Sequence, residues 1–429
     1  MAPVNVLLVE INPFVPACTP ISLGYMAAYL NARGFHTKIL TIGEDTRWSR
    51  VNLETLIRDF QPALVGLSAY QRTMLYVLGF ADLVKSIDED IKVVIGGPQA
   101  TFMPSAALLE MPAVDYICRV SGEVTLAALA EAVRSGMPFS DLAGVSYQRD
   151  GGIFESPAIA GWTDLDDYPS PYLNDVFDYS GMREAIMLTS RGCPHNCIFC
   201  YTPRAFDHQI RFHSIDRVIE EIKWINSRGI RRLWFADPNI SFRWDRVEML
   251  LDRILVEGLH NDIWLQTRAD LVNPTMMKMM KRAGVGTIAF GLESASKRVL
   301  SKLGKNIAVE KVAEAIRLAH SEDVDVELFT IFGLPNETVS DAIETIEFVK
   351  KNNVKIRGNS NSQQMQIYFG THMAENYTTY GIRPLNEKRP TYLSIGSQYE
   401  TETMSQAEMK KIQALWRSES LDRGRRIVS

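Results

Sequence analysis

Three of the five cysteines in this chain, Cys193, Cys197 and Cys200, lie within one stretch of eight residues. Glycine, proline and asparagine residues are interspersed with them and disfavour a regular helix, so the loop can wrap on itself and direct three thiolates at one centre. Three thiolates occupy three corners of a [4Fe–4S] cubane and leave one iron open. An open iron can take a ligand that binds through two atoms, such as an amine and a carboxylate.

Zinc is the alternative occupant of this loop. Structural zinc normally takes four ligands, often in paired C-x2-C spacings, so His195, His208 or His213 would have to supply the fourth. The remaining cysteines, Cys18 and Cys118, are distant in the sequence, and the five together do not form a disulfide framework. These two are most simply explained as buried apolar residues.

Composition limits the number of domains and the classes of partner. The 429 residues are 46% hydrophobic and 23% charged, with a net charge of −5. This length predicts more than one domain, and the acidic balance argues against a nucleic acid as partner because nucleic-acid-binding proteins usually carry a basic excess. The first apolar run, Val4–Val9, is too short for a signal peptide or a membrane span and follows no basic segment. We therefore expect a cytoplasmic protein without a membrane span.

Strand and helix patterns alternate over residues 1–154, which is typical of a parallel, doubly wound, Rossmann-like α/β domain. The strands are expected at Val4–Val9, His36–Leu40, Leu64–Ser68, Lys92–Ile95, Tyr116–Val120 and Gly144–Gln148. The helices are expected near Ser22–Arg33, Leu53–Phe60, Leu75–Ile87, Pro104–Met111 and Val124–Ser135.

Prolines and aspartates interrupt this pattern over residues 155–183, which we expect to be a linker. Alternation resumes over residues 184–381 and predicts a partial (β/α)6 barrel of the TIM type. The strands are expected at Ala185–Thr189, Arg232–Phe235, Ile263–Arg268, Thr287–Phe290, Val324–Ile331 and Gln364–Phe369, and the helices near Ser214–Arg228, Trp244–Glu257, Asn273–Ala283, Ala308–His320 and Val339–Lys351. The tail, residues 382–429, carries one predicted helix near 405–418, which a capping box at Ser405–Glu408 opens.

The cysteine loop and the ends of the predicted strands together resemble a known family. The loop has the spacing C-x3-C-x2-C with an aromatic residue before the third cysteine, which is the signature of the radical S-adenosylmethionine (SAM) superfamily. Further segments resemble the strand ends of that family's barrel, in matching order across Ala185–Met373: Phe235–Asn239, Gln266–Asp270, Gly291–Ser294, Phe332–Thr338 and Tyr368–Thr371.

The resemblance implies roles for individual residues of the barrel. Cys193, Cys197 and Cys200 would ligate the cluster. The implied contacts with SAM are Phe199 and Tyr201 near the adenine, Glu293 and Arg268 at the methionine or ribose, Gln266 nearby, and Gly333 and Leu334 beneath the adenine.

Several of these residues also have a purely structural interpretation. Arg268 and Glu293 could form a salt bridge with each other at the barrel mouth, and Phe199 could be simple packing. Asp237, which follows the second predicted barrel strand, could equally be structural or catalytic.

The strand ends of the first domain lack the G-x-G-x-x-G motif of dinucleotide-binding folds. Segments rich in glycine, proline and small polar residues follow the strands instead, at the carboxyl ends where open α/β sheets bind ligands. Together with Leu165–Pro169 they resemble the cobalamin (B12)-binding domain of B12-dependent radical SAM enzymes. The resemblance then runs from about Val4 to Gly381, and the implied cobalamin contacts are Pro13, Ser68, Tyr70, Gly96, Gly97, Pro98, Gly122 and Glu123.

One departure from the B12 pattern leaves two interpretations of the first domain open. The D-x-H-x-x-G motif, which supplies a histidine to cobalt in many B12 proteins, is absent, and His36 is poorly placed to replace it. Enzymes of the resembled class often bind cobalamin without this histidine. Others keep the domain without the cofactor, in which case it is a platform that only shapes the substrate cleft.

The resemblance implies an enzyme that cleaves SAM to a 5′-deoxyadenosyl radical and, with cobalamin, methylates an unactivated carbon. Its implied partners are a small-molecule or peptide substrate and an electron donor such as a flavodoxin or ferredoxin. The alternatives are a radical reaction without methyl transfer (cyclisation, rearrangement or coupling) and a zinc- or iron-binding regulatory or scaffold protein. No motif identifies the substrate. The aromatic residues of the C-terminal region could line a lid or pack in a core: Tyr377, Tyr380, Tyr392, Tyr399 and Trp416.

Overall fold

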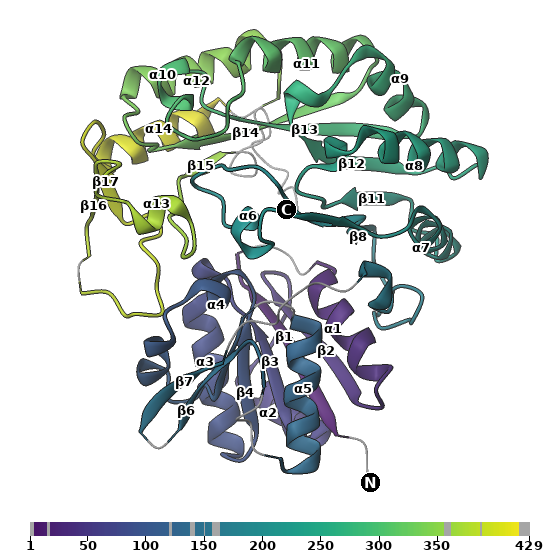
Figure 1. Cartoon of the computed structure of the whole chain (residues 1–429), viewed down its shortest axis with the longest axis vertical. Coiled ribbons are helices and arrows are strands. Elements are labelled where there is room, and N and C mark those ends of the chain that lie inside the picture. The colour runs from purple at the N-terminus through teal and green to yellow at the C-terminus, as the bar shows by residue number, and fades with distance from the viewer. Residues whose placement is uncertain are drawn as a thin grey trace. The chain divides into compact units, whose positions relative to one another are not determined.

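Figure 1 shows a computed structural model of the chain, which describes residues 4–14, 18–119, 122–137, 142–149, 151–156, 164–355, 362–386 and 388–419. These residues divide into two units. The first comprises the chain up to Asp178 together with Lys388–Ser394, and the second begins at Tyr179 and resumes at Ile395. The predicted linker and the end of the tail lie partly outside the described residues, and the predicted domain bounds remain predictions.

The first unit is built on a seven-stranded sheet of order β2-β1-β3-β4-β5-β6-β7. Strands β1 to β5 pair in parallel. Helices α1 and α5 pack against each other on one side of the sheet, and α2 and α3 pack together on the other (Figure 1). The strands are β1 Asn5–Asn12, β2 His36–Gly43, β3 Leu64–Ser68, β4 Lys92–Gly96, β5 Tyr116–Cys118, β6 Val145–Arg149 and β7 Gly152–Glu155. The helices are α1 Ile21–Asn31, α2 Arg50–Phe60, α3 Met74–Ile87, α4 Pro98–Phe102 and α5 Gly122–Ser135.

The Rossmann-like prediction is confirmed, with two local corrections. Strand β6 pairs antiparallel with β5 and with β7. Strand β7 was not predicted, because it is a largely exposed edge strand in which buried and exposed residues do not alternate. The helix predicted at Pro104–Met111 is wrong. The chain forms α4 earlier, where Pro98 takes a first-turn position that suits proline, and then a 3-10 turn at Ser105–Glu110.

The second unit contains a six-stranded sheet of order β15-β14-β13-β12-β11-β8, in which all neighbouring strands are parallel. This confirms the partial (β/α)6 architecture. The strands are β8 Glu184–Met187, β11 Arg232–Phe235, β12 Asp262–Thr267, β13 Val285–Glu293, β14 Asp325–Phe332 and β15 Ser362–Gln364. Helices α7 Ile215–Ser227, α8 Trp244–Val256, α9 Pro274–Arg282, α11 Val309–Ser321 and α12 Val339–Lys351 cover its outer face (Figure 1).

Short elements complete this unit. They are the hairpin of β9 Ser190–Gly192 and β10 Ile210–Phe212, the turns α6 Thr202–Ala205, α10 Lys297–Leu300 and α13 His372–Glu375, the pair β16 Ile382–Pro384 and β17 Tyr399–Thr401, and helix α14 Gln406–Ser418. The predicted capping box of α14 is present, since Ser405 and Glu408 bond reciprocally. Helix α14 packs on α12, β14 and β15, so Tyr399 and Trp416 are buried core residues rather than parts of a lid.

The barrel helices form because their apolar residues recur at helical spacing. In α7, Val218, Ile219, Ile222 and Ile225 are buried, which places one apolar stripe on the sheet. The strand predicted at Gln364–Phe369 is wrong in its position, since β15 spans Ser362–Gln364 and shares only Gln364 with it. The chain leaves the sheet after Gln364, and Ile367 instead pairs with Gly396 of the tail. Among the described helices, none is long and apolar enough to cross a membrane.

Candidate functional site

The cysteine loop is held at both ends and in its middle by backbone contacts. The antiparallel pair β9–β10 frames the loop, with Gly192 opposite Ile210. In the middle, the Ile198 amide donates to the Leu303 carbonyl at 3.1 Å, and the Met373 amide donates to the Ile198 carbonyl at 3.0 Å. Neighbouring segments thus satisfy both backbone groups of Ile198 without a regular helix.

Burial dominates the chemistry of the three thiols. It raises the pKa of Cys193 and of Cys200, and raises the pKa of Cys197 to about 11. The thiols act on one another, and the ammonium of Lys305 is the largest influence that lowers the pKa of Cys197. Within the described residues, no set of three or more His, Cys, Asp or Glu side chains already stands at the distances of a bound metal ion. The structure thus fixes the backbone of the loop and places all three thiols in a buried setting where their charges act on one another.

Asn239 connects the cysteine loop to the third barrel strand. Its side-chain nitrogen lies 3.1 Å from His195 Nε2, and its side-chain oxygen accepts from Thr267 Oγ1 at 2.9 Å. Asn239 is buried, so this bridge is shielded from water. It fixes His195, one of the histidines that could serve as a zinc ligand, against the protein.

Asp237 lies in the protein interior, where the start of the cysteine segment donates hydrogen bonds to it. Its carboxylate is fully buried and accepts from the Thr189 amide at 3.2 Å, from Thr189 Oγ1 at 2.9 Å, and from the Ser190 hydroxyl. Burial raises the pKa of Asp237, and these hydrogen bonds oppose the rise. The residue therefore ties the end of β11 to the start of the cysteine segment.

Arg268 and Glu293 do not form the salt bridge considered from the sequence, so that alternative is wrong. Arg268 pairs with Asp270 at 2.8 Å and donates to the Lys305 carbonyl at 3.0 Å. Glu293 pairs with Lys305 at 2.5 Å. Glu293 also has a left-handed backbone, with φ of +62°, at a register shift between β13 and β14. Such strain at a buried charged residue marks a site that the surrounding structure fixes.

Lys305 was not predicted from the sequence. Its side chain is only 8% exposed. Lysine is rarely buried unless it is paired with an opposite charge, and here Glu293 is that partner. The only local signal was a cation after a glycine in the segment Gly304-Lys305-Asn306, which is common in surface loops.

The other residues predicted to contact SAM lie at the same strand ends. Tyr201 packs edge-on against Tyr368, with ring centroids 6.0 Å apart. Gln266 donates to the Asp237 carbonyl at 3.1 Å. Phe199 is half-buried in the cysteine loop.

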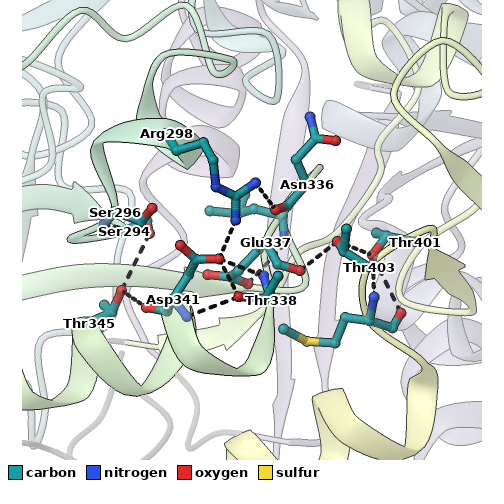
Figure 2. A network of polar contacts seen from close by, with 12 residues as sticks. Ser294, Ser296, Arg298, Asn336, Glu337, Thr338, Asp341, Thr345, Thr401 and Thr403 are labelled. Atoms are coloured by element: carbon teal, nitrogen blue, oxygen red, sulfur yellow. Dashed lines mark hydrogen bonds and ion pairs between the residues drawn. The ribbon is translucent and has the colours of Figure 1, made fainter.

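A polar network supports the turn after β14 (Figure 2). Glu337 Oε2 accepts from the amides of Gly333 at 2.6 Å and Leu334 at 3.2 Å. Gly333 and Leu334 are themselves buried. Burial raises the pKa of Glu337 to about 8, and its Oε1 has no hydrogen-bond partner among the described residues.

The same network joins the ends of β13 and β14 through α12. Thr338 and Asp341 form the capping box of α12, and Arg298 bonds both Asp341 and the Asn336 carbonyl (Figure 2). Deeper in the helix, Thr345 Oγ1 accepts from the Ala295 amide at 2.9 Å. Helix α12 and its capping residues therefore fix the ends of β13 and β14 relative to each other.

The predicted cobalamin residues gather at the carboxyl edge of the first sheet, with Pro13 half-buried after β1 and Glu123 buried in the first turn of α5. Ser68 ends β3, and the Ala69 amide bonds the Gly96 carbonyl at the end of β4 at 2.7 Å. Gly97 has φ of +96°, and a Cβ there would lie 3.2 Å from the Ala69 carbonyl. Gly122 is tighter, since a Cβ would lie 2.5 Å from Met26 Cε. Gly97 thus allows a close approach of two backbone segments, and Gly122 makes room for the Met26 side chain.

Tyr70 follows Ser68 and is 41% exposed. Its hydroxyl nevertheless lies in a desolvated position that raises its pKa, with Glu10 and Cys18 adding to the rise and a hydrogen bond to Ser68 opposing it.

An aromatic patch at this edge was not predicted. The rings of Phe14 and Tyr76 meet edge-on with centroids 5.7 Å apart, and the Arg72 guanidinium lies 3.9 Å above the Phe14 ring. Phe14 is 37% and Tyr76 49% exposed. Exposed aromatic rings beside small residues suit a large, flat, partly apolar ligand, and a corrin is a ligand of this kind. Likewise, three soft thiol ligands in one loop fit an iron–sulfur cluster.

Comparisons with known proteins agree with both halves of this arrangement. Residues 187–349 match the family model of the radical SAM superfamily, and residues 11–130 match that of the B12 binding domain. A protein of Pyrococcus horikoshii, named uncharacterized methyltransferase PH0819, is 32% identical over 337 residues, which cover 77% of this chain and 73% of the relative. The anaerobic magnesium-protoporphyrin IX monomethyl ester cyclase of Rubrivivax gelatinosus is 25% identical over 344 residues, which cover 77% of this chain and 62% of the cyclase.

Among solved structures, the radical S-adenosylmethionine methyltransferase TsrM of Kitasatospora setae, with cobalamin and a [4Fe–4S] cluster bound, matches with a TM-score of 0.77. The match covers 96% of this chain and 81% of TsrM at 18% identity, which shows a shared fold. The chain belongs to the radical SAM superfamily, in the group with an N-terminal B12-binding domain. It is therefore an enzyme, with domains for a [4Fe–4S] cluster, SAM and cobalamin, and the regulatory or scaffold alternative is wrong.

The raised pKa of Glu337 predicts a pH-dependent stability. The unfolded carboxyl group loses its proton above about pH 4.5, whereas the folded one keeps it until about pH 8. The stability of the wild type should therefore fall as the pH rises from 4.5 to 8. Glu337→Gln cannot titrate and should remove this part of the fall, which thermal melts at several pH values can measure. Glu344→Gln, at an exposed position of helix α12, which follows Glu337, is the control, and parallel profiles for Glu337→Gln and wild type would contradict the prediction.

Gly192→Ala should open the cysteine loop. Gly192 has φ of +94°, and a Cβ would lie 2.1 Å from the Gln209 carbonyl, so alanine must break the β9–β10 pairing. We expect most of the iron to be lost on anaerobic purification while cobalamin binding is retained. Gly229→Ala is the matched control, because Gly229 shares the left-handed backbone, with φ of +79°, but a Cβ there meets nothing within 4 Å. Equal iron in both variants would show that the pairing does not hold the loop.

Proposed function

We propose that this chain is a cobalamin-dependent radical SAM methyltransferase that methylates an unactivated carbon of a small-molecule or peptide substrate. The observation that carries the proposal is the combination, in one chain, of a B12-binding domain with a radical SAM domain. The 32% identity to a relative named as a methyltransferase supports it. When bound, the cluster supplies the electron that cleaves SAM and cobalamin supplies a carrier for the methyl group.

The residues of the chain position these groups. In the proposal, Cys193, Cys197 and Cys200 hold the cluster, and the contacts of Ile198 keep the loop in place. Glu293 binds the methionine end of SAM. The other SAM contacts keep the roles that the family resemblance implies, with the backbone of the Gly333 turn supporting the adenine: Phe199, Tyr201, Gln266, Arg268 and Leu334.

The carboxyl edge of the first sheet receives cobalamin in this proposal. The glycines Gly96, Gly97 and Gly122 let the ligand approach the backbone, and Tyr70 presents a half-exposed aromatic side chain. The proposal places the enzyme in the cytoplasm, with a flavodoxin or ferredoxin as electron donor.

A radical reaction without methyl transfer is the second candidate. It is favoured by the 25% identity to a protein named as a cyclase, over 77% of this chain. Both candidates share the cluster and SAM and differ in what happens to the substrate.

The deciding experiment is a count of iron, sulfide and cobalt per chain, on protein expressed with added cobalamin and purified without oxygen. About four iron atoms with about one cobalt would support the methyltransferase, and incubation with methyl-labelled SAM and candidate substrates should then give labelled product. Iron without cobalt would shift the assignment to the second candidate. Zinc in place of iron would contradict both.

Cys197→Ala should separate the two cofactors. Removing one of three thiolates leaves the cluster under-ligated, so we expect iron to fall to a small fraction of the wild-type content and reductive cleavage of SAM to stop. Cobalt should stay at the wild-type level, because the B12-binding domain is a separate match along the chain. Cys18→Ala, outside the cysteine loop, is the control and should keep its iron. Full SAM cleavage by Cys197→Ala would refute the assignment of the loop.

A further inference from the structure

A buried hydrogen-bonded bridge joins the cysteine loop to the end of the third barrel strand, β12. Asn239, only 1% exposed, forms the middle of this bridge. Its side-chain oxygen accepts from Thr267 Oγ1 at 2.9 Å and from the Arg268 amide at 3.4 Å. Its side-chain nitrogen lies 3.1 Å from Nε2 of His195. One side chain thus connects the loop to two successive residues at the strand end.

The direction of each bond follows from which atoms can donate. A backbone amide can only donate, so Oδ1 of Asn239 must face Arg268 and Nδ2 must face His195. The NH2 group of Asn239 can also only donate, so Nε2 of His195 accepts and the ring carries its proton on Nδ1. The bridge therefore selects one tautomer and one orientation of the His195 ring.

A second contact holds the same ring. Phe242 meets His195 edge-on, with ring centroids 6.0 Å apart and planes at 90°. The β9–β10 pairing holds the cysteine loop at Gly192, and the backbone contacts of Ile198 hold it farther along the chain. His195 lies between these two points, so its side chain anchors the part of the loop that contains the first two cysteines.

The backbone of His195 contacts one of those cysteines directly. Its amide donates a hydrogen bond to the Cys193 sulfur, which lowers the pKa of that thiol against the effect of burial. Hydrogen bonds to the sulfurs are among the factors that set the reduction potential of an iron–sulfur cluster. One-electron reduction adds negative charge to the cluster, so a donor at a ligand sulfur stabilises the reduced state more than the oxidised one and raises the potential.

We propose that Asn239 is a positioning residue that raises the reduction potential of the cluster. It does so through His195, because the bridge holds the ring and thereby keeps the His195 amide on the Cys193 sulfur. This inference rests on the proposed function, in which Cys193 ligates the cluster.

The test is the midpoint potential of the cluster in anaerobically reconstituted full-length protein, measured without SAM by a redox titration followed by electron paramagnetic resonance. Asn239→Ala should shift the one-electron equilibrium about tenfold toward the oxidised cluster, as expected for a lost hydrogen bond to a charged group. That shift is a fall of about 59 mV. His195→Ala should give the same fall, because it removes the other half of the bridge, and the iron content should stay at the wild-type level in both.

The double variant Asn239→Ala with His195→Ala makes the test specific. Its potential should fall no further than that of either single variant, because each change already breaks the same bridge. Asn226→Ala is the matched control. It removes a side-chain pair of the same kind, Asn226 with Asn261, ahead of the amino end of β12, and should keep the wild-type potential.

His195→Ala also guards against misfolding of the buried Asn239 variant, because the His195 ring is only half-buried and its removal should leave the cluster in place. A wild-type potential in His195→Ala, or a double variant that shows the sum of the two single shifts, would overturn the inference and leave the proposed function intact. A wild-type protein that takes up no iron would overturn the proposed function itself.

Discussion

Parallel pairing of the barrel strands is the constraint on which the site depends. Strands β8, β11, β12, β13 and β14 lie side by side in parallel, so the segments that follow them must all emerge at one edge. Polar contacts then join neighbouring segments: Asp237 bonds Thr189 across β11 and β8, and Asn239 bonds Thr267 across β11 and β12. Because these bonds are buried, each one fixes the next strand end without competition from water.

This edge contains three buried carboxylates, and each is stabilised in a different way. Asp237 accepts several hydrogen bonds from the start of the cysteine segment. Glu293 is paired with a cation. Glu337 accepts from two backbone amides and keeps its proton up to about pH 8. The first and third are held by hydrogen bonds from neighbouring segments of the protein. Of the three, only Glu293 is held by a charged side chain.

The carboxyl edge of the sheet in the first unit is built from different kinds of residue. Its strand ends carry several small residues, and at Gly97 a Cβ would lie only 3.2 Å from the Ala69 carbonyl, so two backbone segments approach closely there. The exposed rings of Phe14 and Tyr76 add apolar surface. A large, largely neutral ligand matches such a surface better than a charged one, whereas the barrel edge carries buried charged side chains. The two domains thus differ in chemistry as well as in topology.

The sequence by itself determined the cysteine loop, the alternation of strands and helices, and the capping box of the last helix, because these depend on residues a few positions apart. It also pointed to the family through the order of its strand-end segments. Only the tertiary structure decided which charges pair. Arg268 bonds Asp270 rather than Glu293, and Lys305 is drawn from a loop twelve residues beyond Glu293. It also decided that Asp237 and Glu337 are buried and that β6 and β7 pair antiparallel. Burial and pairing of this kind arise when distant segments pack together, and the local pattern of residues does not show which segments will come into contact.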